Sequence, residues 1–174
     1  MNSKKRDLIS NIANEIRSIL NINTDNFNID DIVNTLNGSI INDSFSLDEA
    51  SIVKSSNENF EIHLNNTSSP QRARFSIAHE LGHLFLHMNY LNFDEWERIE
   101  VGTSHSRNTN IPYTIYESEA NEFAASFLMP KDRFMQVAEQ NIVNNYYDLS
   151  EIANTFNVSR EAVAIRGKIL GVWE

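Results

Sequence analysis

Apolar residues recur at helical spacing in the first part of the chain. Between Ser3 and Leu20 they fall three or four positions apart with polar residues between them, which predicts an amphipathic helix packed on the rest of the protein. A second, shorter helix is predicted over Ile29 to Leu36, and Gly38 stands where a left-handed C-cap would end it. The predicted apolar face of the first helix consists of Leu8, Ile12, Ile16, Ile19 and Leu20.

The pattern changes to short, β-branched segments after residue 38. Residues 39–41, 50–54 and 60–65 each predict a strand, and in the last of them Phe60, Ile62 and Leu64 alternate with Glu61 and His63. The turn-like residues 55–59 between the last two predict a hairpin with one buried and one solvated face. The expected sheet is small and antiparallel, or mixed.

A long apolar helix is predicted next. Ser68 or Ser69 is placed to cap it and Pro70 to begin it, and the apolar spacing continues to about Met88. Residues 89–113 show no period, so they predict a long loop of the kind that covers functional regions. Helix is predicted again over the stretch ESEANEFAASFL, with a break at Met129-Pro130 and a resumption afterwards.

The C-terminal residues 149–171 predict two short helices around the turn FNVS, with Ser159 as N-cap and Gly171 as C-cap. This outline resembles a DNA-binding helix-turn-helix. However, the formal net charge of the chain is −10, which opposes attraction to phosphates. A helical hairpin that closes the core is therefore favoured, and no direct nucleic-acid binding is expected. The basic residues of the second helix are Arg160, Arg166 and Lys168.

Together these segments predict an α+β fold in one domain over residues 1–174. Its small sheet packs on the long central helix, with N-terminal helices in 1–38, the sheet and candidate site in 39–130, and helix-turn-helix-like C-terminal helices in 131–174. No apolar run approaches the roughly 20 residues that cross a bilayer, and residues 1–20 do not resemble a signal peptide. A cytoplasmic protein without membrane contact is expected.

The stretch RFSIAHELGHLFLH places three histidines and one glutamate in the long helix. His79 and His83 lie four positions apart, so they share a face and can both bind one ion. Glu80 projects to the adjacent face, where it can take a proton from a water on the metal. The chain has no cysteine, so any ligand must be His, Asp or Glu. The spacing predicts one Zn²⁺ ion, with Mn²⁺ or another divalent ion as the alternative, and hydrolysis of peptide bonds with Glu80 as base.

Two histidines do not complete a catalytic zinc site, so a third ligand is needed. In the segment YESEANEF, Glu117 and Asn121 lie on one helical face, which favours Glu117 as the ligand and Asn121 as the residue that orients a ligand histidine. A capping box formed by Thr114 and Glu117 is the alternative for that glutamate. The candidates considered are Glu117, Glu119, His87, His105 and His63.

The other histidines have different expected positions. A helix rises about 6 Å and turns about 40° over each four-residue step, so His87 is expected beside the site rather than on the metal. His63 is expected on the exposed face of its strand. The candidates for stabilising negative charge in the transition state are His105, Tyr113 and Tyr116.

The chain resembles the ImmA/IrrE family of metallo-endopeptidases over roughly residues 50–171. The resemblance lies in RFSIAHELGH, in ESEANEFAASFLMP, in the strands ending FEIHLNN and in FNVSREAVAIRGKILG. It implies a gluzincin-type enzyme with His79, His83 and Glu117 as zinc ligands, Glu80 as catalytic base and Asn121 as the companion of Glu117.

The resemblance also implies a substrate and a way of holding it. Family members typically cut a cognate helix-turn-helix repressor in phages, mobile elements or stress responses, and an acidic enzyme would attract a basic repressor. The strand Phe60 to Leu64 would then lie at the sheet edge beside the zinc and hold the substrate by main-chain hydrogen bonds. The alternative is a non-catalytic, zinc-containing module that sequesters a repressor, in which His105 would be a fourth ligand.

Overall fold

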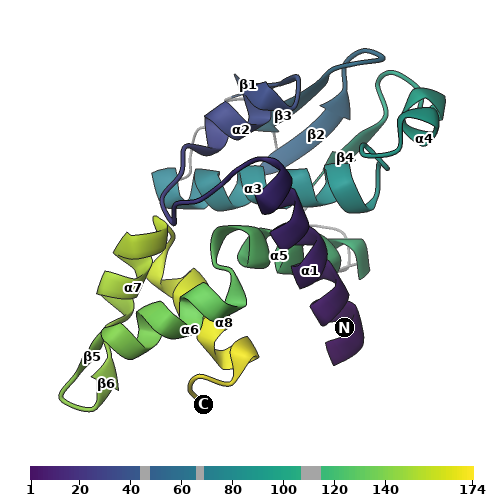
Figure 1. Ribbon diagram of the computed structural model, residues 1–174. Helices are drawn as coiled ribbons and strands as arrows, with labels where there is room; N and C mark the ends of the chain where they lie inside the picture. Colours follow the sequence, from purple (N-terminus) through teal and green to yellow (C-terminus); the bar gives the residue numbers. More distant parts are fainter. Residues whose placement is uncertain (44–47, 66–68, 107–114) are drawn as a thin grey trace.

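The computed structural model describes residues 1–43, 48–65, 69–106 and 115–174 (Figure 1). Helices and strands both contribute to the core, so the α+β class is confirmed. The elements are α1 (Ser3–Ile19), α2 (Ile29–Thr35), β1 (Gly38–Asn42), β2 (Ala50–Lys54), β3 (Phe60–Leu64), α3 (Pro70–Leu86), α4 (Phe93–Arg98), β4 (Ser104–Ser106), α5 (Ile115–Leu128), α6 (Lys131–Gln140), β5 (Ile142–Val143), β6 (Tyr146–Tyr147), α7 (Leu149–Phe156) and α8 (Arg160–Leu170).

The main sheet is mixed and has the strand order β1-β3-β2-β4. Strand β3 pairs with β2 in the predicted antiparallel hairpin and with β1 in parallel, so both of its edges are hydrogen-bonded along Phe60–Leu64. The expectation that Phe60, Glu61, Ile62, His63 and Leu64 form an edge strand for substrate is therefore wrong. Alternation correctly predicted which side chains are buried, but it carries no information about the neighbours of a strand. The edge strand on the β2 side is β4, which pairs antiparallel with β2.

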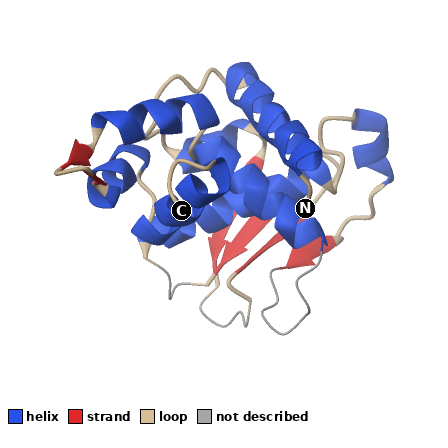
Figure 2. Ribbon diagram, turned by 90° about the horizontal axis from the view of Figure 1, so that it is seen from below, coloured by secondary structure: helices blue, strands red, loops and turns tan. Residues whose placement is uncertain are grey.

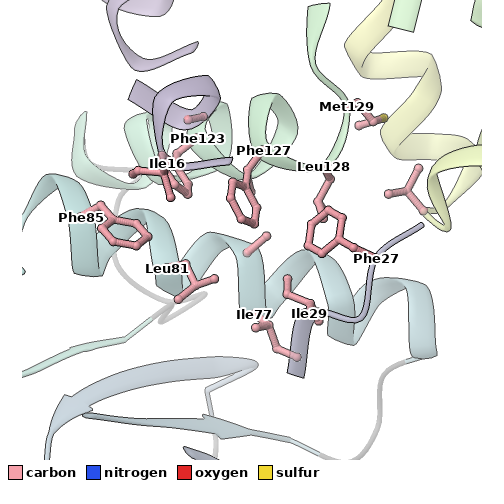
Figure 3. Packing of buried hydrophobic residues seen from close by; sticks show 14 of the residues in the cluster. Ile16, Phe27, Ile29, Ile77, Leu81, Phe85, Phe123, Phe127, Leu128 and Met129 are labelled. Atoms are coloured by element: carbon pink, nitrogen blue, oxygen red, sulfur yellow. The ribbon is translucent and has the colours of Figure 1, made fainter. Parts of the chain in front are cut away.

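Helix α3 lies between the sheet and a layer formed by α5 and α1 (Figures 1 and 2). Its apolar side chains meet the sheet on one side and the phenylalanines of α5 on the other (Figure 3). Phe123 and Phe127 of α5 stack on each other at 5.5 Å between ring centroids, and Phe27 meets Phe127 edge-on at the same distance. Because residues 76–85 of α3 are enclosed on both sides, the polar groups of this part of the helix are held in a dry environment.

Three arginines anchor α5 in this layer. Arg17 of α1 donates a hydrogen bond to the carbonyl of Phe127 at 2.7 Å. Arg6 of α1 and Arg166 of α8 bind the two oxygens of Glu122, at 3.0 and 2.8 Å. Helix α5 is thus tied to both ends of the chain by charged contacts as well as by apolar packing.

The local predictions for the N-terminal region hold in outline and differ in detail. Helix α1 buries Ile9, Ala13 and Ile16, while Leu8 and Ile19 face solvent, so the true apolar face is shifted from the predicted one. Gly38 begins β1 instead of capping α2, and the left-handed residue is Asn37, at φ 59°. A Cβ on Gly38 would lie 2.4 Å from the ring of Phe60, so close packing requires this glycine.

The region predicted as a long loop contains ordered elements. Helix α4 and strand β4 are too short to show a period in the sequence. Lys54 of β2 is fully buried and its Nζ donates to the carbonyls of Trp96 and Ile99, both at 2.7 Å. This lysine therefore helps to hold the segment after α3 on the sheet, together with the pairing of β4 with β2.

The C-terminal lobe consists of α6, α7 and α8 with the small β5–β6 hairpin at its tip (Figure 1). Ser159 caps α8 and Gly171 ends it in the left-handed region, as predicted. The hairpin was not predicted, and its turn is formed by Asn144 and Asn145, both at positive φ. Within the described residues, no helix has the length and apolar character needed to cross a membrane.

Candidate metal centre

Helix α3 presents the His-Glu-x-x-His segment from a rigid position. Ser69 caps the helix by accepting a hydrogen bond from the backbone N–H of Arg72, and Pro70 occupies the first turn. Every residue from Ser76 to Phe85 is buried. The backbone carrying His79, Glu80 and His83 is therefore fixed by a correctly capped helix and by packing on all sides.

Gly82 explains how α5 comes close enough to take part in the site. A Cβ at this position would lie 3.0 Å from Cα and 3.1 Å from the carbonyl oxygen of Ala120, and 3.2 Å from Cβ of Phe123. The glycine therefore allows the backbones of α3 and α5 to approach each other. Glu117 is one turn before Ala120, so this contact brings its carboxylate within reach of the two histidines.

The structure brings His79, His83 and Glu117 together. The Nε2 atoms of His79 and His83 are 3.1 Å apart. Each also lies 3.3 Å from one carboxylate oxygen of Glu117, His79 from Oε2 and His83 from Oε1. Among the described residues these three form a group able to hold a metal ion, with one ligand atom from each within 4.8 Å of the others.

These separations fit a small divalent ion. A tetrahedral zinc ion with bonds of about 2.0–2.1 Å places its ligand atoms about 3.3 Å apart. The two imidazole nitrogens and the carboxylate meet that spacing, and two nitrogens with one oxygen form a donor set that zinc accepts in catalytic sites. The donors at the centre therefore fit a metal ion of the zinc type.

The electrostatics keep at least one of the imidazoles neutral. Burial lowers the pKa of His83 from 6.5 to about 3, and the nearby His79 and His87 act in the same direction while the carboxylate of Glu117 opposes them. A neutral imidazole has a lone pair available for a metal. At neutral pH the contact between His83 and Glu117 is therefore an arrangement of two ligand atoms and not an ion pair.

Asn121 lies where the sequence predicts it. Its Oδ1 is 3.0 Å from Nδ1 of His79, one turn along α5 from Glu117. If this oxygen accepts the Nδ1 hydrogen, Nε2 of His79 is left as a lone pair that faces the centre. The helical spacing of Glu117 and Asn121 thus delivers a ligand and an orienting group from one face.

His87 is beside the centre and not in it. Its Nδ1 lies 2.9 Å from Nδ1 of His83, and its Nε2 lies 3.4 Å from Oε2 of Glu119. Glu119 is buried, and Lys5 of α1 reaches its other oxygen at 3.2 Å. The position of His87 beside the ligand histidines agrees with the prediction. Glu119 was considered as a metal ligand, but its contact with His87 and the contribution of Lys5 were not predicted. The sequence did carry one signal, because the four-residue spacing continues from His79 and His83 to His87. A third histidine on that face that does not bind the metal indicates that another polar group lies next to it.

Glu80 is fully buried on α3, between the two candidate ligand histidines in sequence. A helix turns by about 100° per residue, so its carboxylate projects beside the face of His79 and His83 and not along it. That position suits a group that handles a proton next to the metal. It does not suit a fourth ligand, and Glu80 is outside the ligand group.

The other candidate residues have mixed outcomes. His105 of β4 stacks on His83 with ring centroids 5.2 Å apart, and burial lowers its pKa while Glu117 opposes the shift. Tyr116 is exposed and its ring contacts His87 edge-on at 4.8 Å. Tyr113 lies outside the described residues. His63, on β3, is half-buried and lies 3.3 Å from Glu61.

One basic residue of the helix-turn-helix outline is buried in the structure. Arg166 of α8 is only 1% exposed, and its guanidinium donates to Glu122, to Ser126 and to the carbonyl of Met129. One of the three basic residues of this helix therefore faces the core. The observation agrees with the expected helical hairpin that closes the core.

Comparison with known families identifies a metallopeptidase family. Residues 42–168 match the model of peptidase family M78, described as the IrrE N-terminal-like domain. A search of curated proteins finds no match. The family match begins at the end of β1 and includes α3 and α5, the two helices that form the candidate metal centre. Because the match covers well over half of the chain, this protein belongs to the IrrE N-terminal-like metallopeptidases of family M78.

Proposed function

We propose that this protein is a zinc-dependent endopeptidase of narrow specificity that acts in the cytoplasm on a helix-turn-helix repressor. The observation that carries the peptidase proposal is the convergence of His79, His83 and Glu117 next to a buried Glu80. The family match supports the same chemistry.

The residues have separate roles in the proposed hydrolysis. A zinc ion held by His79, His83 and Glu117 would polarise the scissile carbonyl and lower the pKa of a water molecule toward about 7. Glu80 would accept a proton from that water as it attacks, and would later donate the proton to the departing amine. The low dielectric around the buried carboxylate strengthens its interaction with the charges that develop. Asn121 would keep the Nε2 atom of His79 directed at the centre.

Among the described residues the main sheet has two edge strands, β1 and β4, and we assign the role of holding an extended substrate to β4 in place of β3. Strand β4 pairs with β2 on one side, and among the described residues no strand pairs with its other side. His105 of the same strand stacks on His83, so this edge borders the centre. A peptide added beside β4 would lie next to the metal centre, where His105 is a candidate to stabilise an oxyanion. Tyr116, whose ring contacts His87, stays a second candidate for that role.

A basic DNA-binding protein is the substrate class that the charge of the chain supports. The formal net charge of −10 would attract a basic repressor and increase the rate of encounter, mainly at low salt. The same charge opposes direct binding of the peptidase to DNA.

Incubation of the purified protein with candidate helix-turn-helix repressors tests the proposal, and a neighbouring gene product of that class, where there is one, is the first to try. In each case the intact repressor and its cleavage products are separated by electrophoresis. The zinc-loaded wild type should cleave one of these repressors, and Glu80→Gln should reduce the rate by about 10²–10⁴-fold while zinc remains bound. Glu139→Gln, an exposed substitution of the same kind on α6, serves as the control and should keep full activity. Equal cleavage by Glu80→Gln would exclude Glu80 as the base.

Sequestration without cleavage is the alternative outcome of the same experiment. A closed, structural zinc site has four protein ligands, and a catalytic one leaves a position for water. The described residues supply three ligands, and His105 stacks against His83 instead of joining the group. This observation favours a catalytic zinc site over a structural one. Stable binding of the intact repressor by the wild type, without product, would favour the regulatory module.

A further inference from the structure

A row of polar contacts leads away from the metal centre to the N-terminal helix. It starts at Nδ1 of His83, which is 2.9 Å from Nδ1 of His87. Nε2 of His87 is 3.4 Å from Oε2 of Glu119, and Oε1 of Glu119 is 3.2 Å from Nζ of Lys5. The side chains of His87 and Glu119 are 4% and 9% exposed, so water competes little for these contacts.

The direction of the protons along this row is determined at its acidic end. An ionised carboxylate can only accept hydrogen bonds, so Glu119 requires a hydrogen on Nε2 of His87. A neutral His87 with that hydrogen has a lone pair on Nδ1. Nδ1 of His83 must then carry the hydrogen that joins the two rings, and Nε2 of His83 is left unprotonated.

The Nε2 atom of His79 is also left unprotonated, but through a different hydrogen bond. Oδ1 of Asn121 accepts from Nδ1 of His79, which leaves Nε2 of His79 unprotonated. Two lone pairs therefore face each other across 3.1 Å, with the carboxylate of Glu117 at 3.3 Å from each nitrogen. Three electron-rich groups in contact repel one another, and a cation between them relieves the repulsion.

We propose that His87 and Glu119 are positioning residues, which fix the tautomer of His83 so that its Nε2 atom is always ready to bind the metal. Lys5 extends the row to α1 and holds the carboxylate of Glu119 in place. The inference rests on the proposed metal site but not on peptidase activity. Residues 1–41 precede the family match, so Lys5 belongs to a part of the chain that the match does not include.

Two substitutions of equal shape separate the hydrogen bond from packing. The side chain of His87→Asn retains a hydrogen-bond acceptor near the position of Nδ1. The side chain of His87→Leu has a shape similar to that of asparagine but offers no acceptor. Both lose the ring contact with Tyr116 to the same extent. Zinc affinity, measured by competition with a chromophoric chelator, should fall about 10–100-fold in His87→Leu and clearly less in His87→Asn. Equal affinities in these two variants would overturn the proposal.

Glu119→Gln tests the direction of the protons without removing the hydrogen bond. The amide can donate as well as accept, so it permits both tautomers of His87 and hence of His83. Nitrogen-15 NMR of the zinc-free protein should show Nε2 of His83 unprotonated in the wild type and partly protonated in Glu119→Gln. An unchanged tautomer in Glu119→Gln would also overturn the proposal.

Lys5→Met should weaken zinc binding only a few-fold, because this side chain is 46% exposed and water screens its contact. Lys4→Met, at the adjacent exposed lysine, is the matched control for the loss of one positive charge, and it should leave the affinity unchanged. His63→Leu is the control for loss of a histidine outside the row. A wild type that binds zinc tightly but cleaves nothing would contradict the peptidase proposal and leave this one intact.

Discussion

Gly82→Ala places one methyl group at the contact between the two helices that carry the metal ligands. The added Cβ would lie 3.0–3.2 Å from Cα and the carbonyl oxygen of Ala120 and from Cβ of Phe123. Two of these atoms belong to the backbone of α5 and the third is fixed to it. The helix therefore cannot respond by rotating a side chain, and α5 must move away from α3 by a few tenths of an ångström.

Two opposing effects determine the change in the free energy of unfolding. Replacing glycine by alanine inside a helix stabilises it by about 1 kcal/mol. Overpacking a filled core costs about 1–3 kcal/mol. The net loss is then about 1 kcal/mol, which lowers the Tm of a protein of this size by about 2–4 °C. Movement of α5 also draws Glu117 away from His79 and His83, so zinc affinity should fall roughly tenfold.

Thermal unfolding of the zinc-free protein and chelator competition for zinc measure the two effects separately. Zinc-free protein is needed for the first measurement, because a bound ligand stabilises the folded state in its own right. A Tm that rises by the full propensity gain, together with unchanged zinc affinity, would refute the idea that Gly82 sets the distance between α3 and α5.

Two further predictions concern a buried lysine and a buried histidine. Lys54→Met leaves the carbonyls of Trp96 and Ile99 without their donor, so it should lower the free energy of unfolding, measured in urea, by about 2 kcal/mol or more. Lys4→Met, at an exposed lysine, is the control and should not lower it. Equal urea midpoints for the two variants would contradict this role of Lys54. The pKa of His83 is lowered from 6.5 to about 3, so the unfolded chain binds its proton more readily than the folded one. The zinc-free protein should therefore lose stability as the pH falls from about 6.5 toward 3, by up to about 1.4 kcal/mol per pH unit, and His83→Gln should show a shallower slope in acid titrations followed by circular dichroism. Equal pH dependence of stability in the wild type and in His83→Gln would argue against a neutral, buried His83.

Local signals made the helical part of the fold predictable. Ser69 and Pro70 mark the beginning of α3, and Ser159 and Gly171 mark the ends of α8, because caps act on the few backbone groups beside them. Local signals do not, however, predict the pairing partners of strand β3. Its alternation correctly predicts a buried and a half-buried face, but the parallel partner β1 is about 20 residues away in sequence, and no local signal shows the pairing.

In the candidate site, too, the residues related by helical spacing could be predicted from the sequence, and the contacts between helices could not. His79, His83, Glu117 and Asn121 could be predicted because each pair is separated by one helical turn, and the structure brings the two pairs together. The contact of Glu119 with His87 could not be predicted, because the two residues are on different helices and their distance depends on how α3 and α5 cross.

The buried Arg166 has a consequence for how genetic data on this protein should be interpreted. The residue belongs to the helix that would read DNA if the C-terminal pair were a true helix-turn-helix, yet it holds Glu122 and Ser126 of α5. A loss-of-function allele there would look like a defect in operator recognition. Its primary effect would instead be on the helix that presents Glu117. Suppressors of such an allele should then be sought among residues that support α5, and not among changes in an operator sequence.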